Sequence, residues 1–162
     1  MTEYDSLLKE LEEQEAELQF ERFTNEAALE VGLLIVEAAR TGHHTVTIDI
    51  ERSGQQLFHY AFAGTSPDND QWIVRKNRVV NRFHHSSLHV ATRLKKIGKT
   101  FEEKYYLSSV DYAPHGGAFP IILAGTGVVG TVTVSGLTQE EDHALVVQAL
   151  RKHLTATAKG RT

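Results

Sequence analysis

One glycine-rich stretch in the C-terminal third of the chain decides the fold. It reads HGGAFPI (residues 115–121), GTG (125–127), VTVSGL (132–137) and DH (142–143). These 29 positions hold six of the twelve glycines of the chain. Glycine is favoured where φ is positive or where another group approaches too closely for a side chain. We therefore expect the backbone to turn tightly here, or to lie against a ligand, a neighbouring subunit or another strand.

Alternating apolar residues predict the strands. Two lie within this stretch, at 118–124 and 128–135, joined by a turn at 125–127. An earlier pair, at 44–51 and 56–63, is separated by a Ser53-Gly54 turn and reads as a second antiparallel hairpin. Strands in antiparallel pairs, without βαβ units, predict an α+β fold with a single antiparallel sheet and helices packed on it.

Helical periodicity predicts the remaining elements. A Glu-rich helix with a narrow apolar edge occupies residues 3–20, and a core helix runs from an N-cap at Thr24 to about Arg40. One long helix is predicted over 70–98, with Ser86-Ser87 as a candidate kink, then a helical turn at 101–107 and an edge strand at 108–112. The last helix starts after Thr138, which forms a capping box with Glu141.

The domain boundaries follow from composition. We expect an acidic helical arm at residues 1–22, one α+β domain at 23–157 and a frayed tail at 158–162. Residues 1–30 contain ten Asp or Glu and two Lys or Arg, a balance of −8, within a chain whose net charge is −4. The other 132 residues therefore carry +4. The arm should lie on this basic body, on a neighbour's body, or be solvated.

Composition also excludes several classes of function. The absence of cysteine rules out disulfides, thiolate nucleophiles and iron–sulfur clusters. No apolar run approaches the length of a membrane span, and the first residues lack a basic or apolar leader, so we expect a cytoplasmic protein without membrane contact. A pI of about 6.1 argues against nucleic-acid binding.

A basic stripe follows one side of the predicted long helix. It consists of Arg75, Arg78, Arg82, His85, His89, Arg93 and Lys96, at spacings of three and four. The stripe could neutralise the acidic arm or hold a carboxylate ligand. His85 and His89 could clamp a metal ion, but no acidic or cysteine partner stands at a fixed spacing from them, so no metal site is predicted.

A second candidate anion site lies at the start of the last helix. Ser135 and Gly136 directly precede backbone N–H groups that a helix leaves unpaired. The alternative is that Thr138 and Glu141 already satisfy those groups. The letters GTGVVG at 125–130 match a dinucleotide fingerprint, but a strand rather than a helix follows them, which argues against nucleotide binding.

Four sequence elements together resemble a known family. They are WIVRKN (72–77), Phe83 with SSL (86–88), HGGAFPI (115–121) and VSGL (134–137) with DH (142–143). The chain after residue 20 resembles the GlcG/HbpS-like, or haem-degrading domain, family, and more closely a largely uncharacterised branch of it. The resemblance implies a profilin-like α+β fold, homo-oligomers and, for some relatives, binding of haem or another tetrapyrrole.

The resemblance directs attention to particular residues. A haem site needs an apolar slot, an axial ligand and cations for the propionates. His115 is the histidine nearest the glycine turn, with His85 and His89 as alternatives, and Arg75, Lys76 and Arg78 are candidate cations. The full set of predicted ligand-binding residues is His115, Gly116, Gly117, Arg75, Lys76, Ser135, Gly136 and Asp142.

Two functional hypotheses follow. The first is an oligomeric small-molecule-binding domain, with haem or another anionic tetrapyrrole as the candidate ligand. The second is a non-catalytic homo-oligomeric scaffold or protein-interaction module. No catalytic residue is assigned, because no nucleophile motif is present.

Overall fold

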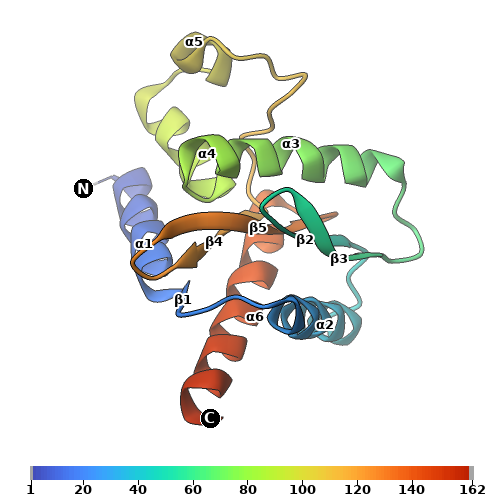
Figure 1. The fold of residues 1–162 in the computed structure, drawn as a ribbon. Helices are drawn as coiled ribbons and strands as arrows, with labels where there is room; N and C mark the ends of the chain where they lie inside the picture. The colour runs from blue at the N-terminus through green and yellow to red at the C-terminus, as the bar shows by residue number, and fades with distance from the viewer. Residues whose placement is uncertain (1, 161–162) are drawn as a thin grey trace.

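A single five-stranded sheet organises the chain, with helices on both of its faces (Figure 1). The computed structural model describes residues 2–160. The elements in chain order are α1 (Glu3–Glu17), β1 (Gln19–Phe20), α2 (Asn25–Thr41), β2 (Thr47–Arg52), β3 (Gln55–Ala61), α3 (Pro67–Phe83), α4 (Ser87–Ile97), α5 (Phe101–Tyr105), β4 (Ala118–Leu123), β5 (Gly127–Ser135) and α6 (Gln139–Gly160). The α+β fold predicted from the strand pairs is confirmed.

The sheet is mixed rather than purely antiparallel. Its strand order is β1-β4-β5-β2-β3, and the β2–β3, β2–β5 and β4–β5 pairs are antiparallel as predicted. β1 runs parallel to β4, with Gln19 opposite Ile122 and Phe20 opposite Leu123. The prediction missed β1 because a strand of two residues is too short to show an alternating pattern.

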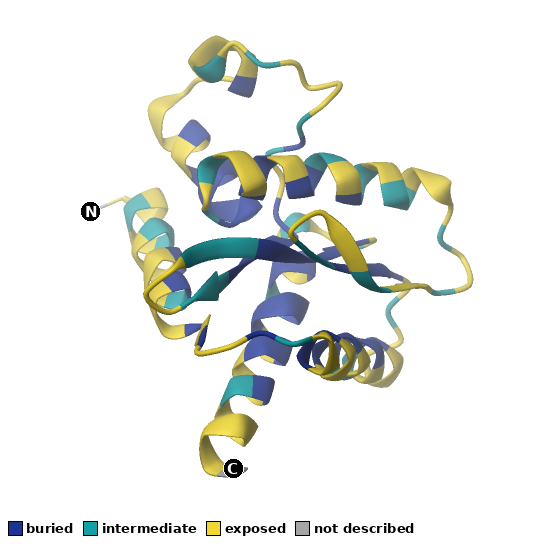
Figure 2. Cartoon of the chain, viewed as in Figure 1, coloured by how far each residue is buried: buried dark blue, intermediate teal, exposed yellow. Residues whose placement is uncertain are grey.

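One face of the sheet carries the main hydrophobic core. Side chains from β2, β4 and β5 point at α2 and α6, which cover this face. The residues of β2, β4 and β5 in this core are Ile48, Ile50, Phe119, Ile121, Val132 and Val134. Figure 2 shows the buried colour on the sheet and on the sides of the helices that face it. The alternating pattern therefore identified this face correctly.

The opposite face of the sheet is polar and is also buried. Thr47, Asp49, Thr131, Thr133 and Ser135 have at most 4% of their surface exposed. Helix α3 covers them, packing against β5, β4 and β2. Buried polar groups require hydrogen-bond partners, and α3 supplies several of them, as described below.

The predicted long helix over 70–98 is wrong, because it is two helices. α3 ends at Phe83, and His84 adopts the left-handed conformation with φ 61°. α4 starts after Ser86, whose hydroxyl accepts a hydrogen bond from the His89 N–H at 3.1 Å. A serine N-cap at this position favours a new helix start. His85 therefore lies between the helices, not on a shared helical face with His89.

The acidic N-terminal segment forms the predicted helix but does not stand apart as an arm. α1 packs against α4 of the same chain and buries Leu11. Its charge is matched across this contact, with Asp5 at 2.5 Å from Lys96. Glu17 accepts two hydrogen bonds from Arg151 of α6. Of the alternatives for the acidic segment, the structure therefore shows packing on the chain's own body.

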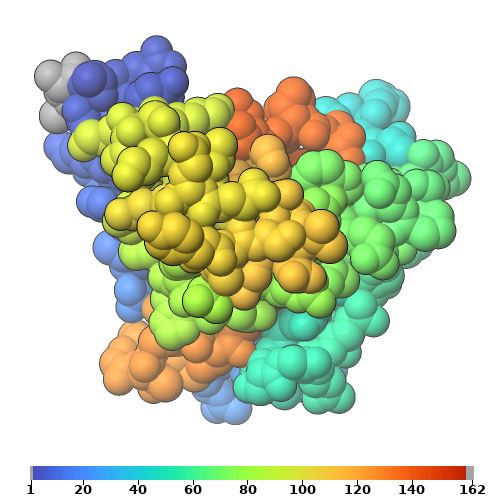
Figure 3. Space-filling view, turned by 90° about the horizontal axis from the view of Figure 1, so that it is seen from above, coloured from blue at the N-terminus to red at the C-terminus, as the bar shows by residue number. Residues whose placement is uncertain are grey.

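The segment after α4 forms a raised layer on α3. α5 matches the predicted helical turn, but 108–112 is a turn and not the predicted edge strand. Arg75 and Arg78 donate to the carbonyls of Ser109 and Asp111, which holds the segment in place without a β-ladder. Figure 3 shows this layer, in yellow and amber, spread over the top of the molecule beside α1 in blue.

The C-terminal helix extends further than predicted. Residues 158–160, expected to be frayed, continue α6, while residues 161–162 of the predicted tail and Met1 of the predicted arm lie outside the described residues. No helix among residues 2–160 has both the length and the apolar character required to cross a bilayer.

Candidate functional site

Most of the predicted ligand-binding residues meet where α3, the end of β5 and the start of α6 converge. A hollow of about 320 Å³ lies there. Its lining includes His115, Lys76, Ser135, Gly136 and Asp142, together with Trp72, Gln139 and three further residues, Asp68, Asn69 and Leu137. The fold thus brings together residues that are distant in sequence. Arg75, Gly116 and Gly117 are not part of this lining.

A buried ion pair forms the floor of this polar hollow. Lys76 Nζ lies 3.2 Å from Asp142 Oδ2, and the side chains are only 4% and 3% exposed. Lys76 also donates to the Val134 carbonyl at 3.1 Å. Asp142 accepts the N–H groups of Leu137 and Gly136 at 2.9 and 3.3 Å. The predicted anion site before the last helix is therefore already occupied by a carboxylate of the chain itself.

Burial and pairing shift the pKa of each member of this pair in opposite directions. Burial lowers the pKa of Lys76, and the charge of Asp142 opposes that shift. Burial raises the pKa of Asp142, and Lys76 and the two backbone N–H groups oppose it. Because each charge has a partner at hydrogen-bond distance, the ion pair is the form that this geometry supports.

The glycines around the pair are explained by contacts within the chain. Gly117 has φ 138°, and a Cβ there would meet the Val134 carbonyl and the Lys76 ammonium. Gly136 has φ 154°, and its Cβ would meet the Thr45 carbonyl. A side chain at Gly117 would therefore clash with groups that build the floor, and one at Gly136 with the chain before β2. These glycines were expected to face a ligand, a neighbouring subunit or another strand. The structure places them against backbone and side chains of the same chain.

The three residues of the Arg-Lys-Asn element point to three different surroundings. Arg75 lies over the Trp72 ring, 4.3 Å from its centroid, at the edge of the hollow. Lys76 reaches Asp142. Asn77 donates to Asp49 at 3.3 Å and accepts from Thr133, beneath the helix. Because neighbouring helical residues point about 100° apart, one short element serves both the hollow and the polar face of the sheet.

His115 lies where the polar hollow meets a second, larger one. Its ring packs edge-on against Trp72, with centroids 5.4 Å apart. Burial lowers the pKa of His115, and the nearby charges of Lys76, Arg75 and Lys95 lower it further. The imidazole makes no side-chain hydrogen bond to any residue in 2–160. At neutral pH it is therefore a neutral ring with nitrogen atoms free to bind a ligand.

The second hollow has a volume of about 550 Å³ and lies between α4, α5 and the chain before β4. Its wall includes apolar side chains of Ala91, Leu94, Phe101 and Pro114. Lys95 and Lys99 also line it, as do His115 and Gln139. We call it the lysine hollow. Sequence reasoning missed Lys95 and Lys99, although their spacing of four residues was a usable signal.

The remaining candidates lie elsewhere. Arg78 interacts with Asp111 of the raised layer. His85 and His89 line neither hollow, and His85 contacts Glu15 of α1 at 2.7 Å. The predicted basic stripe therefore divides into residues that hold the raised layer and residues that meet the acidic helix.

Comparisons with known proteins agree with this architecture. The chain is 56% identical over 145 residues to a UPF0303 protein of Streptomyces coelicolor, covering 90% of this chain and 92% of the relative. Its fold matches the crystal structure of the Ybr137w protein with a TM-score of 0.87 at 36% identity, over 94% of this chain and 90% of that one.

A more distant structure shares the fold alone. The PduOC–haem complex matches with a TM-score of 0.67 at 13% identity, over 80% of this chain and 93% of that one. The family model described as haem degrading protein HbpS-like matches residues 23–151. That span includes strands β2 to β5, Lys76, His115 and Asp142. On this evidence the chain belongs to the HbpS-like family of haem-degrading proteins.

Proposed function

We propose that this domain binds a flat anionic tetrapyrrole, with haem as the ligand to test, in the lysine hollow beside His115. The observation that carries the proposal is a neutral imidazole that has no side-chain hydrogen bond within residues 2–160. It borders a hollow lined by apolar side chains and by Lys95, Lys99 and Glu103. Ligand pockets of about 300–1,000 Å³ with few convergent polar groups are typical of small-molecule sites.

The residues present fit the three requirements of a haem site. Leu94, Phe101 and Ala91 offer apolar contact to the macrocycle. Lys95 and Lys99 offer positive charge to propionates, the role that we first assigned to Arg75, Lys76 and Arg78. His115 offers an axial nitrogen, and its contact with Trp72 restricts the orientation of the ring. Bound haem would supply an iron centre with redox and oxygen chemistry.

The comparisons support the choice of ligand. The family model that matches residues 23–151 is described as haem degrading, and one protein of the same fold has been crystallised as a haem complex. The polar hollow on the other side of His115 would then hold a solvent-exposed polar edge of the ligand, or a small anion.

A haemin titration followed by the Soret band tests the proposal. We expect a shifted Soret band at one haem per chain, lost in His115→Ala and weakened about 10-fold in the double variant Lys95→Gln with Lys99→Gln. His44→Ala, which changes a histidine outside both hollows, is the matched control. A band that is unchanged in His115→Ala would contradict axial ligation by this residue.

A second candidate function is assembly into homo-oligomers that act as a scaffold. It rests on exposed apolar side chains of α2, where Leu29 and Leu33 are 43% and 53% exposed and lie one helical turn apart. β3 is also an edge strand, with Tyr60 exposed. Light scattering behind a sizing column should show an oligomer that Leu33→Glu weakens, and a monomeric wild-type chain would contradict the proposal.

A further inference from the structure

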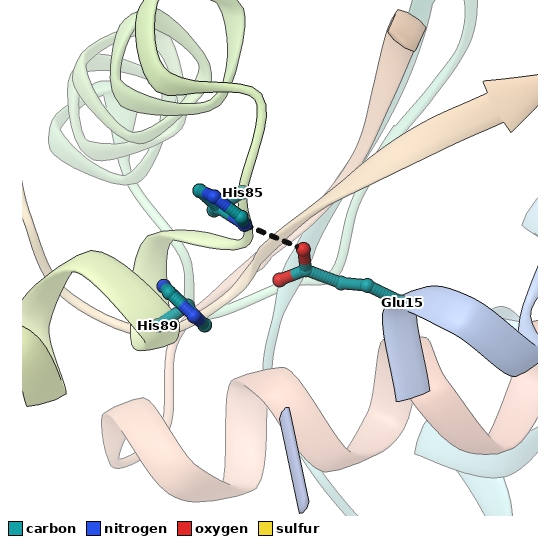
Figure 4. Close-up of side chains that lie close together, drawn as sticks. All are labelled: Glu15, His85 and His89. Atoms are coloured by element: carbon teal, nitrogen blue, oxygen red, sulfur yellow. Dashed lines mark hydrogen bonds and ion pairs between the residues drawn. The ribbon is translucent and has the colours of Figure 1, made fainter. Parts of the chain in front are cut away.

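Three metal-ligating side chains from separate parts of the chain converge beside α4. Glu15 comes from α1, His85 from the link between α3 and α4, and His89 from the first turn of α4 (Figure 4). One ligand atom from each lies within 4.8 Å of the others. The two imidazole rings are stacked, with centroids 4.2 Å apart and planes 11° apart. We call this group the Glu-His-His cluster.

The fold supplies the acidic partner that the sequence did not reveal. Glu15 lies 70 residues before His85, and the packing of α1 on α4 brings the two together. Glu15 Oε1 lies 2.7 Å from His85 Nδ1, and Oε2 accepts the Ser86 N–H at 3.1 Å. The carboxylate is therefore held in place by a backbone group, as the supported ligands of metal sites are.

His89 is the feature that a structural role does not explain. Its side chain is 3% exposed. Neither of its ring nitrogens has a hydrogen-bond partner within residues 2–160. The nearest carboxylate, that of Glu12, lies 3.7 Å from Nε2, beyond hydrogen-bond distance. A buried polar group without a partner costs stability, so this imidazole is placed for a ligand that completes its bonding.

The protonation state of His89 agrees with that role. Burial lowers the pKa of His89. Glu15 raises the pKa of His85, so metal binding would displace a proton from His85. The neutral imidazole is the form that coordinates a metal ion. Positive residues on α4, which argued against a metal site from sequence, are offset by Glu12 and Glu15 of the acidic helix.

We propose that Glu15, His85 and His89 bind one divalent transition-metal ion, with zinc as the representative ion, and leave a fourth position for water or Glu12. Two imidazoles and one carboxylate suit zinc rather than calcium or magnesium, which prefer oxygen ligands. Tetrahedral zinc sites hold ligand atoms roughly 3.3 Å apart. The side chains must therefore close inward by about 1 Å, within the reach of small side-chain rotations.

Metal binding at this position would join the N-terminal helix to the corner between α3 and α4. The ion would replace long contacts between α1 and His89 with coordinate bonds. It should therefore stabilise the folded chain increasingly as its concentration rises above the dissociation constant, because an ion that binds only the folded state shifts the unfolding equilibrium. This inference concerns residues that line neither hollow and does not depend on haem binding.

Titration of the full chain with Co²⁺ and Zn²⁺, after treatment with a chelator, tests the site. We expect one Co²⁺ per chain with the visible absorption of a tetrahedral ion, displaced by Zn²⁺. His85→Ala should weaken binding at least about 100-fold, and His89→Gln should do the same. His43→Asn is the matched control, since His43 is exposed and has a positive φ that Asn tolerates.

The outcomes separate the alternatives. Circular dichroism establishes whether each variant folds. If His89→Gln does not fold, His85→Ala decides alone, because His85 is only partly buried. A rise in the melting temperature with Zn²⁺ that disappears in His85→Ala would support the site. Absence of the Co²⁺ band at large excess, or equal affinity in His85→Ala and His43→Asn, would overturn the proposal.

Discussion

The Lys76–Asp142 pair differs from the imidazoles of the exposed His115 and the buried His89 in how its polar groups are satisfied. The lysine and the aspartate satisfy each other and also bond to backbone groups. Neither imidazole has a side-chain hydrogen bond to a described residue. Lys76 lies on α3, Asp142 on α6 and His89 on α4, and His115 lies in the chain before β4.

This difference separates residues that stabilise the fold from residues that are available to bind a ligand. A charge with all its partners inside the chain contributes to the fold, and removing one partner leaves the other uncompensated. A neutral ring with an unused nitrogen contributes little to the fold and gains from a ligand. The candidate site is thus centred on His115 and not on Lys76 and Asp142.

Removal of one member of the ion pair should have the largest effect. Lys76→Met leaves Asp142 buried without its counter-charge, and we expect a loss of about 3–5 kcal/mol in the free energy of unfolding. Urea unfolding followed by circular dichroism measures this loss. The double variant Lys76→Met with Asp142→Asn should regain most of it, because no charge then stays unpaired.

A loss below about 1 kcal/mol in Lys76→Met would contradict the claim that the Lys76–Asp142 pair contributes to the fold. It would mean that Asp142 is neutral in the folded chain or that water reaches it, and Lys76 would then be available to a ligand.

Acid should destabilise the protein through buried histidines. Burial lowers the pKa of His143 from 6.5 to about 4. Its Nε2 lies 2.8 Å from Gln14 Oε1, while Nδ1 has no partner in the described chain. Between these pKa values the unfolded chain binds more protons than the folded chain, so stability falls as pH falls from 6.5 toward 4. We expect a loss of up to about 3 kcal/mol from this residue.

Urea unfolding at pH 7 and at pH 4.5 measures the effect, with His143→Gln as the comparison. Glutamine does not titrate, so the variant should lose less stability on acidification. Burial also lowers the pKa of His89, His115 and His153, which act in the same direction and stay in the variant. An identical pH dependence in both chains would show that His143 is already protonated or never becomes so.

Removal of His115 should have the smallest effect on stability. The ring gives up its edge contact with Trp72 and no side-chain hydrogen bond, so His115→Ala should cost about 1 kcal/mol or less. The same urea unfolding measures it. A cost near that of Lys76→Met would place His115 among the residues that build the fold, and the distinction between the two regions would be lost.

Local signals were sufficient for much of the fold. The N-cap of α2 at Thr24, its end at Gly42 and the capping box at Thr138 were all predicted and are present. These features depend on residues within one helical turn. The break between α3 and α4 was predicted only as a candidate kink at Ser86-Ser87, because the apolar spacing continues through it. β1 was missed because two residues show no period.

The candidate site was predicted in part. The polar hollow does collect His115, Lys76, Ser135, Gly136 and Asp142, since the motifs that carry the family resemblance lie at the ends of neighbouring elements. Lys95 and Lys99 were missed, because their role depends on the layer formed by α5. The acidic partner of His85 was also missed, because nothing in local spacing relates α1 to α4.

The sequence by itself determined most of the secondary elements, the family and the apolar face of the sheet, because each depends on periodicity or on short motifs. Only the tertiary structure decided what happens to the polar face of the strands. A period of two says that Thr47, Asp49 and Thr133 point away from the core, but not whether water or a helix lies there. α3 covers them, and its Asn77 bonds to Asp49 and Thr133, whereas the Thr47 hydroxyl has no partner among the described residues.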